Sequence, residues 1–256
     1  MLFVHPMPND RSCWAYQVAH FSSWFRTITV DLPGLGNSPP AEPGVSMAGL
    51  ADACWDAVDQ VSGEPAILVG LSIGSTIVKY MACIRPERAL ALILTGGPFY
   101  ADPARPHIPI EKPFAYFADA LERSGPDGRR ALLLENFSPA FAESPLGRYF
   151  VSLIMERSES SDIASMVRLI RALIPADPGW LHRDISCPVL IVMGGSDKAR
   201  SQQGHRVMHA NLPSSELQVI ENAGHCCNME RPWEYDRHVI QFLTRHGLLD
   251  ISHSGE

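Results

Sequence analysis

The chain has 256 residues, of which 46% are hydrophobic, and its formal net charge at pH 7 is −7. This length suits one large domain, with room for an inserted lid, better than two independent domains. Because the charge balance is acidic and no basic run occurs, we expect no nucleic acid and no membrane surface as a partner. No apolar segment is long enough to span a bilayer, and Met1 leads into a segment that is too short for a signal peptide.

The six cysteines lack the spacing of a disulfide framework; they are Cys13, Cys54, Cys83, Cys187, Cys226 and Cys227. Most of them stand in apolar contexts, which favours reduced thiols and predicts a cytoplasmic protein. The adjacent pair at positions 226 and 227 has no second pair, so it is a poor zinc motif. We therefore predict no metal and no other cofactor.

In the first hundred residues, strand-like segments alternate with helical ones. Strands are predicted at residues 2–4, 27–30, 66–69 and 89–94, and helices at residues 14–24 and 46–61. Ser46 is a suitable N-terminal capping residue for the second of these helices.

The alternation stops after residue 98, and residues 99–184 contain only helical segments punctuated by prolines. Apolar side chains recur there at helical spacing, at Phe114, Phe117, Leu121, Ile163, Met166, Val167, Ile170 and Leu173. Helix packing explains most such stripes. A helical insertion between two strands can also serve as a lid, and some of these side chains would then face a ligand.

Alternation resumes after Pro188, with strands predicted at 189–193 and 216–220 and helices at 200–210 and 232–245. The strand at 189–193 is apolar throughout, as expected where helices cover both faces of a parallel sheet. We predict an α/β fold with a doubly wound, mostly parallel sheet. In such a fold, loops at the carboxyl ends of the strands form the site.

The pattern Gly70-Leu71-Ser72-Ile73-Gly74 stands between a predicted strand and a helix marked by Ile77, Met81 and Ile84. Glycine two residues before and after the serine permits a turn that is too sharp for a Cβ at either position. The serine is then presented at a helix N-terminus, where free N–H groups favour negative charge. Ser72 is therefore a candidate nucleophile, although it could also merely cap the helix.

Ser72, Asp197 and His225 each follow the carboxyl end of a predicted parallel strand. Because those ends lie on one edge of the sheet, three residues far apart in sequence can converge there. Taken singly, Asp197 could cap the next helix and His225 could be an ordinary loop histidine. The order Ser…Asp…His and the shared position at strand ends favour a catalytic triad.

On these residues, the chain resembles an α/β-hydrolase-fold serine hydrolase, similar to esterases and lactonases with a helical cap. The segments that carry the resemblance are His5-Pro6-Met7, Asp31-Leu32-Pro33-Gly34-Leu35-Gly36-Asn37-Ser38, Gly70-Leu71-Ser72-Ile73-Gly74, Gly194-Gly195-Ser196-Asp197 and Asn222-Ala223-Gly224-His225. The resemblance implies a core domain formed by residues 1–98 and 185–256, with a helical cap inserted at residues 99–184.

The resemblance also implies roles for the site residues. Ser72 would be the nucleophile, His225 the general base and then acid, and Asp197 the group that orients and stabilises the imidazolium. The backbone N–H groups of Met7 and Ile73 would form the oxyanion hole.

The first loop departs from the family pattern, because His5-Pro6 stands where the family usually has His-Gly. Proline lacks an amide hydrogen, so Met7 is the only main-chain donor between Pro6 and Pro8. The two prolines would stiffen the loop around that donor. A rigid turn without catalytic purpose is the plainer interpretation.

The start of the chain departs as well. Family members commonly open with a β-hairpin, whereas this chain is already at the first core strand, so we expect a sheet that lacks the hairpin. Residues 27–30 would then form an edge strand with unpaired backbone groups. We expect another segment or a second subunit to cover that edge, which would make the protein a homodimer in the second case.

We predict hydrolysis of a small carboxylic ester or lactone with an apolar or aromatic acyl group, because the cap is aromatic and contains methionine. The candidate substrate-binding residues are His5, Phe99, Phe137, Met166 and Cys226. One alternative is C–C bond hydrolysis of a β-diketone or dienoic acid by the same triad. A second, of another class, is a ligand-binding sensor that retains the triad. A lyase reaction is weaker, because related lyases favour cysteine where Ile73 stands.

Overall fold

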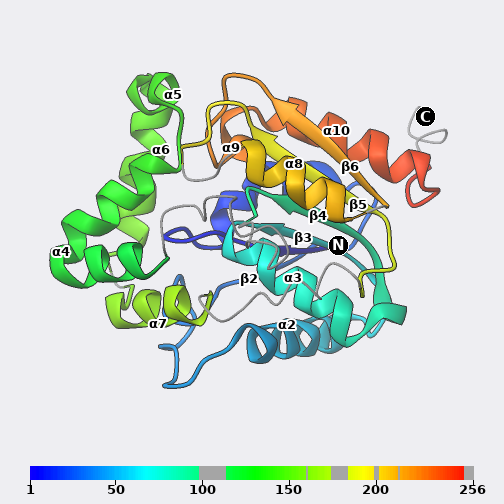
Figure 1. Cartoon of the computed structure of the whole chain (residues 1–256), viewed down its shortest axis with the longest axis horizontal. Coiled ribbons are helices and arrows are strands. Elements are labelled where there is room, and N and C mark those ends of the chain that lie inside the picture. Colours follow the sequence, from blue (N-terminus) through cyan, green and yellow to red (C-terminus); the bar gives the residue numbers. More distant parts are fainter. Residues whose placement is uncertain (98–113, 160, 174–183, 199–201, 213, 251–256) are drawn as a thin grey trace.

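A parallel sheet runs through the centre of the molecule (Figure 1). The structure, a computed structural model, describes residues 1–97, 114–159, 161–173, 184–198, 202–212 and 214–250. The strands found there are β1 (Leu2–Val4), β2 (Ile28–Val30), β3 (Ala66–Leu71), β4 (Ala89–Thr95), β5 (Val189–Gly194) and β6 (Ser215–Ile220). They lie in the order β2-β1-β3-β4-β5-β6, and every neighbouring pair is parallel. The predicted α/β fold is confirmed.

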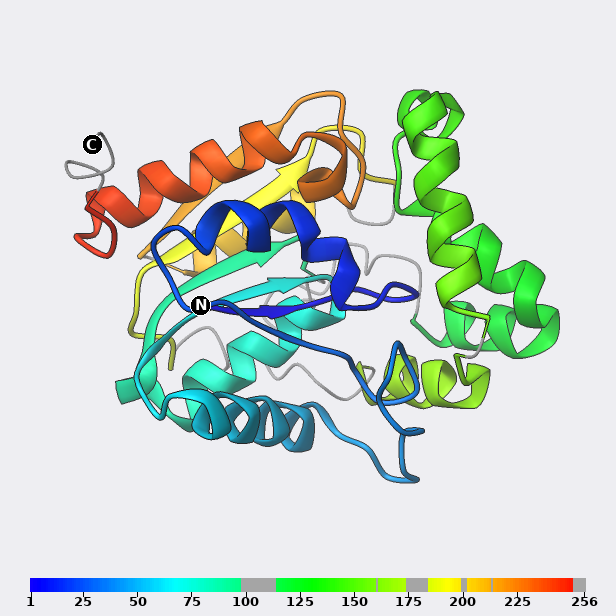
Figure 2. The same ribbon diagram turned by 180° about the vertical axis from the view of Figure 1, so that it is seen from behind.

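Helices cover both faces of the sheet, as Figures 1 and 2 show from opposite sides. One face carries α2 (Met47–Val61), α3 (Ile73–Ile84) and α8 (Gln202–Asn211). The other carries the 3₁₀ turn η1 (Arg11–Trp14), α1 (Ala15–Phe21), α9 (Cys227–Glu230) and α10 (Pro232–Arg245). A further 3₁₀ turn, η2 (Pro86–Arg88), precedes β4. Helix α2 begins as predicted, because the Ser46 Oγ accepts a hydrogen bond from the Gly49 N–H at 3.1 Å.

The strands alternate their side chains between two hydrophobic clusters, one on each face. Leu68 and Leu92 pack in the cluster with α2 and α3, whereas Ile67 and Ile93 pack in the cluster with α1 and α10. All residues of β3 and β5 are buried. This double burial explains why both strands are continuous apolar runs in the sequence.

Strand β2 forms one edge of the sheet, as expected for residues 27–30. Its three residues are half-buried and, within the described chain, they pair with β1 alone. Whether a second subunit covers this edge stays a prediction.

The helical insertion lies beside the carboxyl ends of the strands, where the arrowheads point in Figures 1 and 2. Its helices are α4 (Phe114–Glu135), α5 (Pro139–Glu143), α6 (Pro145–Arg157) and α7 (Ile163–Leu173), all between β4 and β5. Ser138 and Ser144 cap α5 and α6, and each is followed by a proline, which is favoured at the first helical position. The insertion is confirmed, while its boundaries at residues 99 and 184 stay a prediction.

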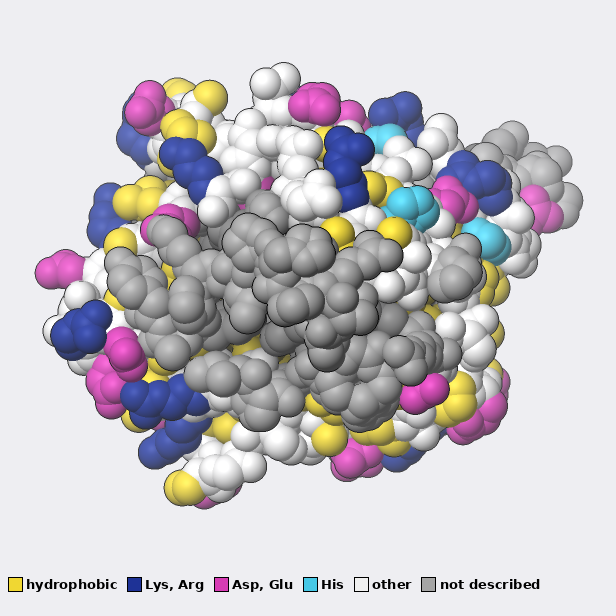
Figure 3. Space-filling model, viewed as in Figure 1, with side chains coloured by type: hydrophobic (Ala, Val, Ile, Leu, Met, Phe, Trp, Pro, Cys, Tyr) yellow, Lys and Arg dark blue, Asp and Glu magenta, His cyan; other side chains and the backbone are white. Residues whose placement is uncertain are grey.

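The surface and the thiols agree with the composition. Acidic and basic side chains are interspersed around the described part of the face in Figure 3. None of the described helices is long and apolar enough to cross a membrane. All six cysteines are free thiols, and every one but Cys83 is buried.

Candidate active site

Ser72 occupies a strained turn between β3 and α3. Its φ is 56° and its ψ is −117°, a conformation that costs a residue with a side chain about 1–3 kcal/mol. A Cβ at Gly70 would lie 2.3 Å from the Gly74 carbonyl oxygen, and one at Gly74 would lie 2.2 Å from that of Val4. The two glycines of the motif therefore permit the turn.

The backbone holds Ser72 against the next strand, because its N–H donates to the Thr95 carbonyl at 2.9 Å. The side chain of Ser72 makes no capping bond to α3. The simpler interpretation of Ser72 as a helix cap therefore has no support in the structure. Ile73 begins α3, so its N–H is among the helix's free N-terminal donors.

Asp197 and His225 form a buried pair. The His225 Nδ1 lies 2.8 Å from the Asp197 Oδ2, and the side chains are 2% and 0% exposed. Asp197 follows β5 and His225 follows β6, and the Ser196 N–H donates to the Ala223 carbonyl at 2.9 Å between the two loops. An imidazole held this way at Nδ1 presents Nε2 to a reacting group.

The imidazole also lies against the end of β4. A Cβ at Gly96 would fall 2.6 Å from the His225 Cε1, so only glycine allows the ring to approach. Gly96 follows Thr95, whose carbonyl binds the Ser72 amide. Ser72 and the Asp197–His225 pair therefore both border the end of β4, at Thr95 and Gly96.

The loop after β1 is fixed by His5. Its Nδ1 lies 2.8 Å from the Pro6 carbonyl, and its Nε2 accepts a hydrogen bond from the Leu32 N–H at 2.9 Å. Since Nε2 is the acceptor, Nδ1 carries the proton and donates to Pro6. Burial lowers the pKa of His5, which keeps the ring in this neutral form.

This geometry corrects one prediction. We expected His5 to contact the substrate, but both of its ring nitrogens bind the protein's own backbone. His5 is fully buried, so it holds the loop rather than a ligand.

Met7 stands at the centre of the same loop and is 9% exposed. Within the described residues, no group accepts a hydrogen bond from its N–H, whereas its carbonyl accepts one from the Asn136 Nδ2 at 2.9 Å. A buried amide of this kind is a suitable donor for a ligand oxygen.

The remaining predicted substrate contacts lie within the packed interior. Phe137 contacts the ring of Phe141 at 5.3 Å between centroids, and Met166 is fully buried in the cluster of α2 and α3. The Cys226 Sγ accepts a weak hydrogen bond from the Asn9 Nδ2 at 3.7 Å, and burial raises the pKa of this thiol. Phe99 lies outside the described residues.

The segment Asn136–Ser138, between α4 and α5, ties the insertion to the histidine loop; we call it the first anchorage. The Cys226 N–H donates to the Asn136 carbonyl at 2.8 Å. Glu230 accepts hydrogen bonds from the Ser138 N–H at 2.8 Å, from the Ser138 hydroxyl at 2.6 Å and from the Gly224 N–H at 2.9 Å. Sequence reasoning missed Asn136 and Glu230, because no local motif marks either residue.

The segment Asp162–Arg168, at the start of α7, ties the insertion to the loop after β2; we call it the second anchorage. The Ala41 N–H donates to the Ser165 Oγ at 2.7 Å, and the Arg168 guanidinium donates to the Ala41 carbonyl at 2.6 Å. The Asp162 N–H donates to the Gly34 carbonyl at 3.0 Å. No bond here involves Met7 or the histidine loop.

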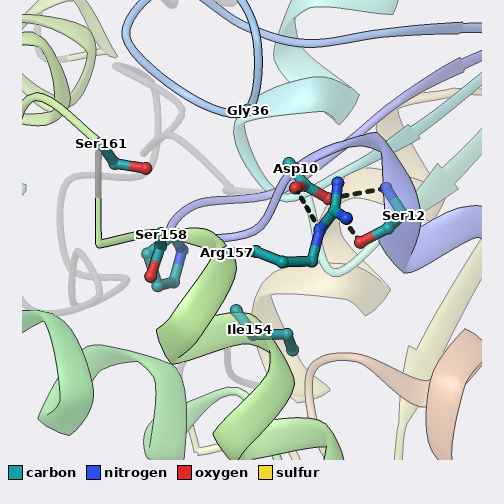
Figure 4. Close-up of a pocket in the computed structure, with 8 residues that line it drawn as sticks. Asp10, Ser12, Gly36, Ile154, Arg157, Ser158 and Ser161 are labelled. Atoms are coloured by element: carbon teal, nitrogen blue, oxygen red, sulfur yellow. Dashed lines mark hydrogen bonds and ion pairs between the residues drawn. The ribbon is translucent and has the colours of Figure 1, made fainter.

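A third, more exposed contact lines the small pocket in Figure 4. The Arg157 Nε lies 2.8 Å from the Asp10 Oδ2, which joins α6 to the start of η1. Asp10 is partly buried, which would raise its pKa, but its hydrogen bonds from Ser12 and Arg157 outweigh this effect and lower the pKa.

The site has no metal-binding character in the described part of the chain, where no three His, Cys, Asp or Glu side chains form a group suited to an ion. The arrangement offers a hydroxyl on a strained turn, a buried Asp–His pair and the backbone N–H groups of Met7 and Ile73. This set suits nucleophilic acyl transfer.

The comparisons with known proteins agree with this fold. Residues 1–235 match the sequence profile described as the alpha/beta hydrolase family. The chain belongs to this family and is an α/β-hydrolase.

Relatives within the family include several hydrolases. The (E)-2-((N-methylformamido)methylene)succinate hydrolase of Acinetobacter baylyi is 24% identical over 95% of this chain and 89% of its own length. The carboxylesterase YbfK of Bacillus subtilis is 24% identical over 95% of this chain and 79% of its own length. The crystal structure of the enol-lactonase from Burkholderia xenovorans LB400 superposes with a TM-score of 0.83 and 21% identity, covering 95% of this chain and 91% of that one.

Proposed function

We propose that the protein is a serine hydrolase that cleaves a small carboxylic ester or lactone through a covalent acyl-enzyme. The observation that carries the proposal is the buried bond between Asp197 and His225, with the imidazole against Gly96. That position is next to Thr95, which holds the backbone of Ser72. Both the carboxylesterase and the enol-lactonase among the similar proteins support the class of substrate.

In the first step, the Ser72 hydroxyl attacks the carbonyl carbon of the substrate. His225 takes the serine proton on Nε2, because its Nδ1 already carries the proton directed at Asp197. The buried carboxylate stabilises the imidazolium that forms. His225 then returns the proton to the leaving alkoxide, which frees the alcohol or opens the lactone.

The negative charge on the tetrahedral intermediate requires donors that are fixed before the reaction. The N–H of Ile73, at the start of α3, and the N–H of Met7 supply them, and the dipole of α3 adds to the effect. Water activated by His225 then hydrolyses the acyl-enzyme through the same arrangement.

The substrate is proposed to be small and apolar or aromatic on its acyl side, since the insertion beside the carboxyl ends of the strands carries aromatic and apolar side chains. C–C bond hydrolysis and ligand sensing use the same residues, and no specific contact favours either. We also propose a cytoplasmic location and a homodimer in which the partner subunit covers β2.

Turnover with a p-nitrophenyl ester and a panel of lactones tests the proposal. We expect multiple turnover by the wild type and about a 10⁴-fold or greater loss in Ser72→Ala. A fluorophosphonate should label Ser72 rapidly and should not label the variant. Labelling at another residue, or wild-type protein without turnover on any acyl substrate, would contradict the proposal, and the second result would favour a sensor.

A further inference from the structure

Asn136 is a buried polar residue, 3% exposed, immediately after α4. It hydrogen-bonds both the loop of Met7 and the loop of His225. Its side-chain amide donates to the Met7 carbonyl at 2.9 Å. Its own carbonyl accepts from the Cys226 N–H, the residue after His225, at 2.8 Å.

The bond from Asn136 to the Met7 carbonyl restricts the backbone conformation of Met7 from its second side. A peptide unit is planar, so the Met7 N–H lies in one plane with the Pro6 carbonyl, which His5 holds at 2.8 Å. The next plane contains the Met7 carbonyl, which Asn136 holds. With both planes fixed, the two soft torsions of Met7 are fixed as well.

The bond to Cys226 is reinforced on either side of the histidine. Glu230 accepts from the Gly224 N–H, directly before His225, and from both donors of Ser138. The insertion thus bonds the histidine loop directly at Cys226, and it also bonds Glu230 of α9, which holds Gly224.

We propose that Asn136 is a positioning residue for catalysis. It fixes the position of the Met7 amide relative to the loop that carries His225. The inference rests on the proposed function, in which Met7 donates to the oxyanion and His225 is the base. Asn136 touches neither substrate nor reacting atoms. It acts by restricting the direction of one donor and the position of one base.

The test is Asn136→Asp, which keeps the size of the side chain and the backbone bond to Cys226 but removes the donor to Met7. We expect kcat to fall by about 10- to 100-fold with KM within about threefold, because a misdirected oxyanion donor weakens transition-state binding. The rate of fluorophosphonate labelling at Ser72 should fall in parallel. Asn136→Ala, which introduces no charge, should give a similar loss of kcat. It replaces Asn136→Asp as the test if that variant folds poorly.

Asn228→Asp is the matched control. Asn228 is also fully buried, and its Nδ2 donates to the Cys13 carbonyl at 3.1 Å and to the Gln17 Oε1 at 3.3 Å. This variant loses the same donor in a similar environment but does not touch Met7. We expect a comparable fall in melting temperature, with kcat per folded molecule within about threefold of the wild type.

The outcomes separate the inference from the proposed function. If the wild type shows turnover and labelling at Ser72 but both Asn136 variants match the Asn228 control in kcat, the positioning role is wrong and the hydrolase proposal stands. If the wild type shows neither turnover nor labelling, the proposed function is wrong, and the inference fails with it.

Discussion

The first and second anchorages join the same helical insertion to the same core, but they contact different loops. Asn136–Ser138 binds the loops that carry Met7 and His225, whereas Asp162–Arg168 binds the loop after β2. Both use buried or partly buried hydrogen bonds of 2.6–3.0 Å. Similar bonds in one domain are thus expected to differ in effect: loss of the first should change the rate, and loss of the second should change stability alone.

Asp197→Asn should cause the largest fall in kcat of the variants that act through His225. The amide cannot accept the Nδ1 proton as a carboxylate does, so the wrong imidazole tautomer is favoured. We expect kcat to fall by roughly four orders of magnitude, with a melting temperature close to that of the wild type. Steady-state kinetics and thermal unfolding check this, and a loss of only a few-fold would mean that another carboxylate serves His225.

Glu230→Gln tests the first anchorage from the histidine side. The neutral side chain keeps an acceptor for the Ser138 and Gly224 N–H groups but weakens those bonds, because it loses the charge. We expect kcat to fall by about tenfold. An unchanged kcat would show that the loop keeps its position without this carboxylate.

The same variant changes the dependence of stability on pH. Burial raises the pKa of Glu230 above its ordinary value of 4.5, although the hydrogen bonds from Ser138 and Gly224 oppose this. The folded protein therefore holds this proton more tightly than the unfolded chain, and the stability so gained is lost as pH rises through the folded-state pKa. The melting temperature of Glu230→Gln, relative to the wild type, should rise from pH 4.5 towards neutrality.

Ser165→Ala tests the second anchorage and should have the smallest kinetic effect. It removes the acceptor of the Ala41 N–H and the bond to Asp162. We expect stability to fall by about 1–2 kcal/mol, while kcat and KM stay within about twofold of the wild type. If kcat falls as far as it does in Asn136→Asp, the distinction between the two anchorages is wrong.

Much of the fold and of the candidate triad could be predicted from local patterns. Continuous apolar runs gave β3 and β5, and α10 spans the predicted residues, because each signal lies within one element. Ser72, Asp197 and His225 could be predicted for a related reason. Each follows a recognisable strand, and the topology of a parallel sheet brings strand ends together.

The contacts of buried polar residues could not be predicted in this way. His5 looked available for a substrate, because nothing near it in the sequence shows that the Leu32 N–H reaches its ring. Asn136 and Glu230 find their partners on distant segments, so only the folded chain reveals their bonds. Polar roles that depend on long-range packing leave no periodicity to detect.

The position of Asn136 determines where this protein can be recombined with a relative. A graft of foreign helices that begins at α5 would retain Asn136–Ser138 and both loops they hold. A graft that begins at α4 would also exchange Asn136 and with it the donor to Met7. A chimaera made to change substrate specificity should therefore be joined after Ser138, inside the insertion rather than at its edge.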